Sequence, residues 1–280
     1  MDFRAVEENL RQSFRVLAAG RPATDVTELP GVTIASLGAQ FQMFNAAFLS
    51  APADTVEELD DRLETARAHF AARDTAWSFW ICEGWLAGTA RRKLSRSCQN
   101  AGLRLSSEMP GMVANSICPP ARRLPRLEIR RVTSGQGMED FRAIGATCFH
   151  VPLVWFAEVF DHEMAGRADF VCQTGYVDGE PVATAATVTT PDGTIGLYNV
   201  ATSPAHRRHG YAEAVTRYSI DAARDAARDA ARNGNGSERV ILQATMQGYE
   251  LYRRLGFSEV TRILVYNSVA FSSGHGAKQA

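Results

Sequence analysis

The sequence predicts an α/β (α+β) fold, because strand-like and helix-like segments alternate along most of its 280 residues. Residues 194–202 and 239–245 have the composition of strands, and residues 211–232 between them contain almost no helix breaker. A shorter helical segment follows at 248–255. The order strand, helix, strand, helix indicates a sheet covered by helices.

Upstream segments continue this pattern. Residues 127–132, 169–177 and 182–189 are strand candidates, and residues 137–150 and 154–164 are helix candidates. Asp-Gly pairs at 178–179 and 192–193 mark turns. Three prolines within 118–125 indicate a boundary. We therefore expect two lobes, at residues 1–120 and 126–270, with residues 271–280 as a flexible tail.

The hexapeptide at 207–212, Arg-Arg-His-Gly-Tyr-Ala, lies between a predicted strand and the long predicted helix. The start of a helix exposes unpaired N–H groups and the positive end of a dipole. A turn containing Gly210 at this point can direct backbone donors toward a phosphate. The segment is therefore predicted to bind an anion.

Two motifs resemble those of the GCN5-related N-acetyltransferase (GNAT) family. Its phosphate-binding signature, Arg or Gln, two residues, Gly, one residue, then Gly or Ala, is matched by Arg207, Gly210 and Ala212; Arg208 replaces a frequent glycine. The second motif is Leu-Tyr-Arg-Arg-Leu-Gly-Phe at 251–257. The resemblance covers about 125–270. Rossmann and P-loop sites are disfavoured, because their acidic residue and their Gly-Lys-Ser/Thr are missing.

The resemblance implies a GNAT fold, with a central mixed, mostly antiparallel sheet flanked by helices. It also implies acetyl-CoA as cosubstrate and direct transfer of the acetyl group to an amine. In the family, the strand before the anion site splays from its neighbour and, with that site, binds the cosubstrate. The corresponding residues are Val200, Ala201, Thr202, Arg207, Arg208, His209, Gly210, Tyr211 and Ala212. Tyr252 matches the tyrosine that protonates the leaving thiolate, a role that a phenol with a pKa near 10 can fill.

The general base is harder to assign. Many relatives carry a glutamate on the strand before the anion site, where this chain has Tyr198 and Asn199. An amine must lose a proton before it attacks. A water chain is one route for that proton. Residues in the region that shapes the acceptor site are the other, namely His150, Glu158, Asp161 and His162.

The first lobe is predicted to be a degenerate half-copy of the second. Strand candidates at 43–48 and 76–82 flank a helix at 55–73, residues 93–103 correspond to 250–257, and residues 108–112 are a closing strand. The turn before the helix lacks glycine, and Asp54 there would repel a pyrophosphate, so we expect no CoA site. This lobe should be structural or should form a wall of the acceptor cleft. Its conspicuous aromatic residues favour core packing over an amine pocket: Trp77, Phe79, Trp80 and Trp85.

Composition narrows the remaining possibilities. A net charge of −1 argues against a nucleic-acid partner. No apolar run approaches a membrane span, and the charged N-terminus lacks a signal core. Five cysteines without metal-ligand spacing support neither a disulfide framework nor a metal site. We expect a cytoplasmic protein without a metal, and oligomers are possible.

Two charged segments fall outside these motifs. Arginines gather near the lobe boundary, at positions 122, 123, 126, 130 and 131; an exposed linker and strand edge is favoured, and an acidic-ligand patch is the alternative. The Asp-Ala-Ala-Arg repeat at 221–232 predicts an exposed helix extension, with a partner-docking arm as the alternative.

The predicted function is an acetyl-CoA-dependent N-acetyltransferase acting on a small-molecule amine. Two alternatives stay open. The acceptor could be a protein lysine or N-terminus, which would require an open acidic groove. The chain could also bind CoA without turnover, as a sensor or structural protein.

Overall fold

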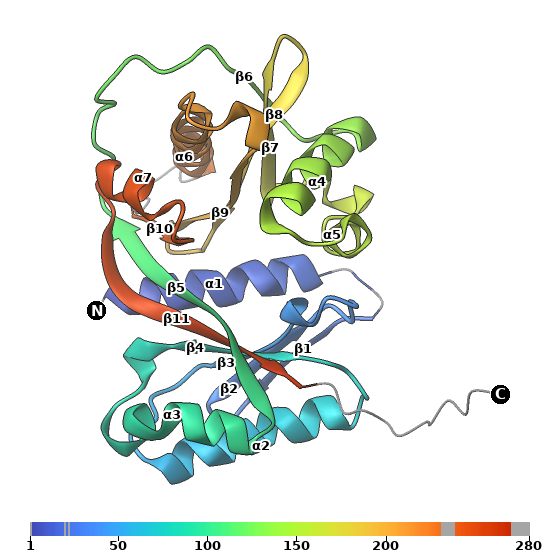
Figure 1. Cartoon of the computed structure of the whole chain (residues 1–280), viewed down its shortest axis with the longest axis vertical. Coiled ribbons are helices and arrows are strands. Elements are labelled where there is room, and N and C mark those ends of the chain that lie inside the picture. Colours follow the sequence, from blue (N-terminus) through green and yellow to red (C-terminus); the bar gives the residue numbers. More distant parts are fainter. Residues whose placement is uncertain (1, 20, 22, 231–238, 270–280) are drawn as a thin grey trace, which may run out of the picture.

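A single mixed sheet with helices on both faces runs through the molecule (Figure 1). The computed structural model describes residues 2–19, 21, 23–230 and 239–269. The strands are β1 (Asp25–Leu29), β2 (Val32–Ser36), β3 (Asn45–Leu49), β4 (Ser78–Cys82), β5 (Leu103–Ala114), β6 (Glu128–Arg131), β7 (Val171–Val177), β8 (Glu180–Thr189), β9 (Ile195–Thr202), β10 (Val240–Gln243) and β11 (Ser258–Ser268). Within the described chain their order across the sheet is β1-β2-β3-β4-β11-β5-β10-β9-β8-β7-β6.

The helices follow the predicted alternation with strands. They are α1 (Asp2–Ala18), α2 (Val56–Ala71), α3 (Gly88–Asn100), α4 (Gly135–Phe149), α5 (Leu153–Val159), α6 (Tyr211–Ala230) and α7 (Tyr249–Arg254). Short 3-10 turns are η1 (Gln42–Phe44), η2 (Glu83–Trp85), η3 (His162–Met164) and η4 (Pro204–His206). The predicted fold class, α/β with a mixed sheet flanked by helices, is confirmed.

One predicted helix is wrong in its extent. The segment 154–164 is divided into α5 and η3. Between them the Asp161 side chain accepts hydrogen bonds from the amides of Glu163 and Met164, at 3.0 and 3.2 Å. An aspartate in this position starts a new turn and does not continue the previous one.

The two lobes share a four-strand unit. Strands β1 to β4 and strands β7 to β10 each form two antiparallel pairs followed by one parallel pair, β3 with β4 and β9 with β10. In each lobe a helix connects the parallel strands, α2 in the first and α6 in the second. The predicted half-copy began at residue 43, but the repeated unit also includes β1 and β2, which lie before it. The first lobe therefore repeats more of the second lobe than the sequence predicted.

The last strand of each lobe pairs with the other lobe. Strand β5, from the first lobe, is antiparallel to β10, and β11, from the end of the chain, is antiparallel to β4. These two long strands also pair with each other, from Ser258 opposite Val113 to Ser268 opposite Leu103. The sheet therefore continues across both predicted lobes, 1–120 and 126–270. The division of the chain into these two lobes stays a prediction.

Helix α1 was not predicted, and it links the lobes. Its buried side chains include Val6, Leu10 and Phe14, which lie on one face of the helix. Asn9 donates to the carbonyls of Val188 (3.2 Å) and Thr194 (3.0 Å) in the second lobe. These bonds fix the first lobe's helix to the strand pair β8–β9.

The prominent aromatic residues of the first lobe lie in its core. Trp77, Phe79, Trp80 and Trp85 are all buried, and Trp77 stacks on Phe70 with ring centroids 5.1 Å apart. Core packing is confirmed, and the alternative of an aromatic amine pocket is wrong because these rings have no open face.

The Asp-Ala-Ala-Arg repeat continues α6 through Ala230. Asp225 is exposed and pairs with Arg228 at 3.0 Å, one turn away. Residues 231–232 of the repeat and the predicted tail at 271–280 lie outside the described residues. Among the described helices, none has the length and apolar character needed to cross a membrane.

Candidate active site

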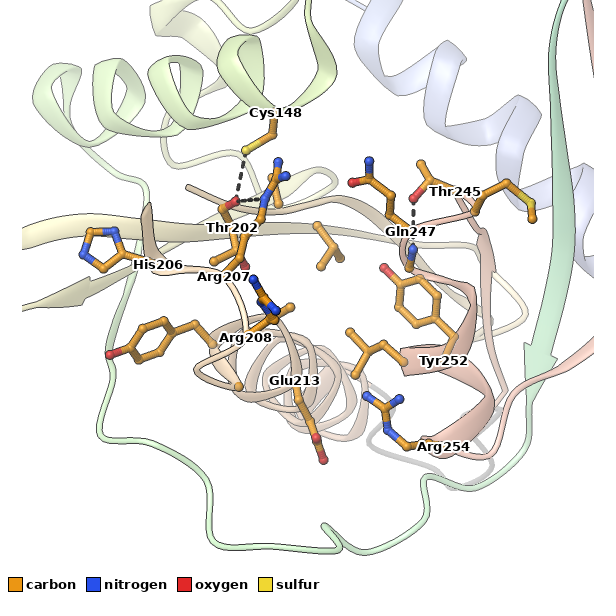
Figure 2. A pocket seen from close by; sticks show the side chains of 18 of the residues that line it. Cys148, Thr202, His206, Arg207, Arg208, Glu213, Thr245, Gln247, Tyr252 and Arg254 are labelled. Carbon is orange, nitrogen blue, oxygen red and sulfur yellow. Dashed lines mark hydrogen bonds between the residues drawn. The ribbon is translucent and has the colours of Figure 1, made fainter. Parts of the chain in front are cut away.

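A pocket of about 660 Å³ lies between the end of β9, the start of α6 and helix α7 (Figure 2). Apart from His209, every residue predicted to bind the cosubstrate or to act in catalysis lines it, namely Val200, Ala201, Thr202, Arg207, Arg208, Gly210, Tyr211, Ala212 and Tyr252. His209 is exposed and stacks on Tyr211, with ring centroids 5.8 Å apart. The structure thus brings together the two sequence motifs, which are some 40 residues apart.

The pocket opens where β9 separates from β10. The parallel pairing of these strands runs from Ile195–Val240 to Leu197–Leu242 and ends there. Strand β9 continues to Thr202 with β8 as its partner, and Asn199 has a positive φ of 50° at a register shift between the two. The backbone of β9 beyond Leu197 therefore has no strand on the β10 side.

Helix α6 begins at the edge of this opening. Its first turn contains the bond from the Ala214 amide to the Gly210 carbonyl at 3.0 Å. The amides of Tyr211, Ala212 and Glu213 come before this first donor and consequently have no acceptor within the helix. With the helix dipole, they provide a site for an anion.

The turn before α6 depends on left-handed backbone at two positions. Gly210 has a φ of 90°, and Arg208 has a φ of 66°. The first suits glycine, whereas the second places an arginine in a conformation that costs about 1 kcal/mol or more. Arg208 thus adopts the left-handed backbone that the family's more frequent glycine would adopt more easily.

Charge in the pocket also favours an anion. Its basic lining residues are Arg122, His150, His206, Arg207, Arg208 and Arg254. Its acidic lining residue, Glu213, is held by Arg217 at 2.9 Å, one helical turn away. Two buried lining atoms, Thr202 Oγ1 and His206 Nδ1, have no hydrogen-bond partner in the described chain. The pocket therefore fits a multiply charged phosphate ligand with further polar groups.

Tyr252 lies at the other side of the opening, with its hydroxyl directed into the pocket (Figure 2). Its ring packs edge-on against Phe257, with centroids 5.8 Å apart, and the residue is 7% exposed. Burial raises the pKa of Tyr252 above that of an ordinary tyrosine. The phenol therefore keeps its proton at neutral and mildly alkaline pH.

Of the residues considered as a base, His150 alone lines the pocket. Glu158 accepts a hydrogen bond from the Gln40 amide at 2.9 Å, and Asp161 pairs with Arg21 at 2.9 Å. His162 is exposed and faces Glu139 at 3.4 Å. These three residues belong to the contact between the lobes or to the outer surface of α4 and do not line the pocket, so the structure gives them no contact that supports a role as the base.

The strand residues Tyr198 and Asn199 are not placed to act as bases either. The Tyr198 hydroxyl donates to Asn9 Oδ1 at 2.6 Å, and burial raises its pKa. The Asn199 side chain holds no ionisable group, and its carbonyl accepts from Thr184 Oγ1 at 2.9 Å. Within the described residues, β9 has no carboxylate.

Several lining residues were not identified as site residues from the sequence: Cys148, Phe149, His206, Glu213, Thr245, Met246, Gln247, Gly248, Leu251 and Arg254. Arg122, which also lines the pocket, was included only in the alternative of an acidic-ligand patch. Most lie beside the two motifs and could have been found by including the flanking loops. Cys148 is an exception, since it comes from the end of α4 and donates to the Thr202 carbonyl at 3.3 Å. Only the tertiary structure shows that contact.

Comparison with known families decides what kind of domain this is. The model described as "Acetyltransferase (GNAT) family" matches residues 139–257. These residues form a GNAT acetyltransferase domain. The match confirms the family suggested by the two motifs and, with it, the enzyme class, N-acetyltransferase.

Solved structures extend the similarity to both lobes. A GCN5-related N-acetyltransferase from Kribbella flavida is 21% identical with a TM-score of 0.65, over 93% of this chain and 95% of that one. A conserved protein of unknown function from Staphylococcus epidermidis is 15% identical (TM-score 0.62; 89% and 95% covered). A GCN5-related N-acetyltransferase from Sphaerobacter thermophilus is 14% identical (TM-score 0.55; 85% and 76%). A search of curated proteins gave no match. At these identities the likeness shows the two-lobed fold.

The first lobe has no opening equivalent to that of the GNAT domain. Strands β3 and β4 pair again beyond their ends, where Ala53 bridges to Leu86. The Asp54 carbonyl then accepts from the amides of Thr89 and Ala90 at the start of α3, at 2.9 and 3.3 Å. The chain's own backbone occupies the place where the GNAT domain has its pocket. No residue of the first lobe lines that pocket. That this lobe forms a wall of the acceptor cleft stays a prediction.

Proposed function

We propose that the GNAT domain transfers an acetyl group from acetyl-CoA directly to the amine of a small molecule. One observation carries this proposal: a basic helix start, an unpaired strand edge and a protonated phenol meet in one pocket. These are the groups that acyl transfer from a thioester requires.

Each part of the pocket has a separate task in this proposal. The amides at the start of α6 and the side chains of Arg207 and Arg208 would hold the pyrophosphate. The side of the β9 backbone that faces away from β8, at Val200, Ala201 and Thr202, would hold the pantetheine arm and orient the thioester carbonyl. When bound, the cosubstrate supplies an acyl group that is activated as a thioester.

Tyr252 would donate its proton to the departing thiolate. Because burial raises its pKa, the phenol is fully protonated at the pH at which the reaction runs. His150 is the remaining candidate to accept the amine's proton, directly or through water, because it lines the pocket and is exposed to solvent. The acetyl group would move to the nitrogen, the thiolate would leave with the tyrosine proton, and the amine's proton would pass to His150 or water. Tyr252 would then regain a proton from solvent before the next turnover.

The charge of the pocket favours particular acceptors. A polycationic peptide or polyamine needs carboxylates to offset its charge, and the pocket's acidic side chain, Glu213, is already paired with Arg217. Phe149 and Met246, both exposed, add apolar surface to the lining. We therefore propose a small amine with a neutral, apolar or anionic body. The alternative of a lysine-rich protein acceptor predicts an acidic groove, which this lining does not provide.

The test is acetyl-CoA-dependent release of free thiol with matched amines. Phenethylamine and an amino acid represent the favoured acceptors, and spermidine and a lysine-rich peptide represent the disfavoured ones. We expect kcat/KM to be at least tenfold higher for one of the first pair. If no amine raises thiol release above the hydrolysis background although acetyl-CoA still binds, the result would support the non-catalytic sensor instead.

The Tyr252→Phe variant separates catalysis from binding in the same assay. It removes only the hydroxyl, so affinity for acetyl-CoA should be kept while kcat falls by about 100-fold or more. An unchanged kcat would remove Tyr252 as the acid.

A further inference from the structure

The linker between the lobes passes directly beside the anion site. It leaves the end of β5 at Ala114 and reaches β6 at Glu128, and Figure 2 shows it running past α6 and α7. From the sequence, its arginines were interpreted as an exposed linker and strand edge, with an acidic-ligand patch as the alternative. The contacts below assign one of them a different role.

Three contacts fix the start of the linker to the GNAT domain. The Cys118 amide donates to the Leu255 carbonyl at 2.9 Å, at the end of α7. Arg217 Nη1, from α6, donates to the Cys118 carbonyl at 2.7 Å. Gly256 leaves room for this approach, because a β-carbon there would lie 2.9 Å from Cys118 Sγ. The linker is thus attached to both helices that border the pocket.

Further along, the linker meets the turn of the anion site. A β-carbon on Gly210 would lie 3.3 Å from Pro125 Cδ and 3.8 Å from Arg122 Nη2. Arg122 also lines the pocket. Its guanidinium therefore lies next to the backbone turn that precedes α6.

The arginines near the lobe boundary differ in what they contact. Arg130 pairs with Glu128 and lies over the Tyr176 ring, and Arg131 donates to the carbonyls of Gly166 and Arg167. Arg122 has no hydrogen bond or ion pair with any residue that the structure describes, yet it alone of the cluster lines the pocket. A guanidinium held beside an anion site without a protein partner is suited to a phosphate.

We propose that Arg122 binds a phosphate group of CoA, so that the inter-lobe linker forms the outer wall of the cosubstrate site. This inference rests on the proposed function, because it takes CoA as the ligand. The pyrophosphate and the 3′-phosphate present the same chemistry to a guanidinium, and the choice of ligand in the experiment distinguishes them.

The experiment compares Arg122→Gln with Arg123→Gln, a neighbouring exposed arginine that does not line the pocket. Affinities for CoA and for 3′-dephospho-CoA are measured by calorimetry on the full chain. We expect Arg122→Gln to weaken CoA binding roughly tenfold and Arg123→Gln to change it less than twofold. Arg122→Lys, which keeps the charge, should recover part of the loss.

The two ligands locate the contact. An equal loss for both ligands assigns Arg122 to the pyrophosphate, and a loss for CoA alone assigns it to the 3′-phosphate. Equal effects of Arg122→Gln and Arg123→Gln, or no loss in Arg122→Gln, would overturn the inference while the proposed function stands. Failure of the unmodified chain to bind CoA would instead remove the proposed function. Unchanged melting temperatures without ligand would show that the variants are folded.

Discussion

The ring of Tyr252 packs against Gly248 so closely that a β-carbon on the glycine would lie 2.9 Å from Tyr252 Cε2. Gly248 immediately precedes α7, and its amide donates to the Thr245 carbonyl at 3.0 Å. The glycine therefore sets the distance between the phenol and the loop that forms this side of the pocket.

We predict that Gly248→Ala lowers kcat about 100-fold, because a displacement of the acid by about 1 Å has a cost of that order. Acetyl-CoA affinity should be kept, since the anion site lies on the opposite side of the pocket. Steady-state kinetics and calorimetry measure the two quantities. Gly135→Ala is the control, because a β-carbon there has no neighbour closer than 3.6 Å. Equal kcat values in both variants would show that the position of Tyr252 is not critical.

The raised pKa of Tyr252 predicts the shape of the pH–rate profile. A phenol whose pKa lies above the ordinary value of about 10 stays protonated throughout the range in which the amine acceptor loses its proton. The rate with an alkylamine should therefore rise with pH and show no descending limb below about pH 10. A fall in kcat near pH 8 to 9, with the protein still folded, would contradict Tyr252 as the acid.

The bond from Tyr198 to Asn9 predicts a stability contribution from α1. Asn9→Ala removes this bond and the two bonds to Val188 and Thr194, and should lower the free energy of unfolding by about 2 kcal/mol or more. Tyr198→Phe should cost about 1 kcal/mol, and the double variant should cost less than the sum. Urea unfolding measures all three. Strict additivity would show that the two side chains do not interact.

Closure of the first lobe predicts a single CoA site per chain. At the start of α2, the counterpart of α6, the amides of Val56 and Glu58 already donate to Thr89 Oγ1 and Thr55 Oγ1, both at 3.2 Å, so they are not available to a phosphate. Calorimetric titration with acetyl-CoA should therefore give a stoichiometry of one. A value of two would mean that the first lobe opens in solution.

The sequence allowed the second lobe to be predicted more fully than the first. Local signals carried it: the glycine turn at 207–212, the long helix after it and the Leu-Tyr and Gly-Phe pairs at 251–257. Helix α1 could also have been found, because Val6, Leu10 and Phe14 have helical spacing.

Other features are not encoded locally. Strands β5 and β11 pair with each other and with the opposite lobes, and nothing in their own residues specifies which neighbour each will have. The approach of Arg122 to Gly210 and of Cys148 to Thr202 likewise depends on the assembled chain. These contacts shape the pocket, so the sequence alone suggested the ligand class but not the full lining.

The most direct test of the proposed cosubstrate site is the thermal stabilisation produced by acetyl-CoA in the unmodified chain, in Gly210→Trp and in Gly179→Trp. Both glycines have a similar positive φ, 90° and 84°, but Gly179 lies in the turn between β7 and β8 with open space around it. At about 100 times the dissociation constant, the ligand should raise the melting temperature of the unmodified chain and of Gly179→Trp by several degrees, and leave Gly210→Trp unchanged. A rise of the same size in Gly210→Trp would contradict a cosubstrate site at this turn.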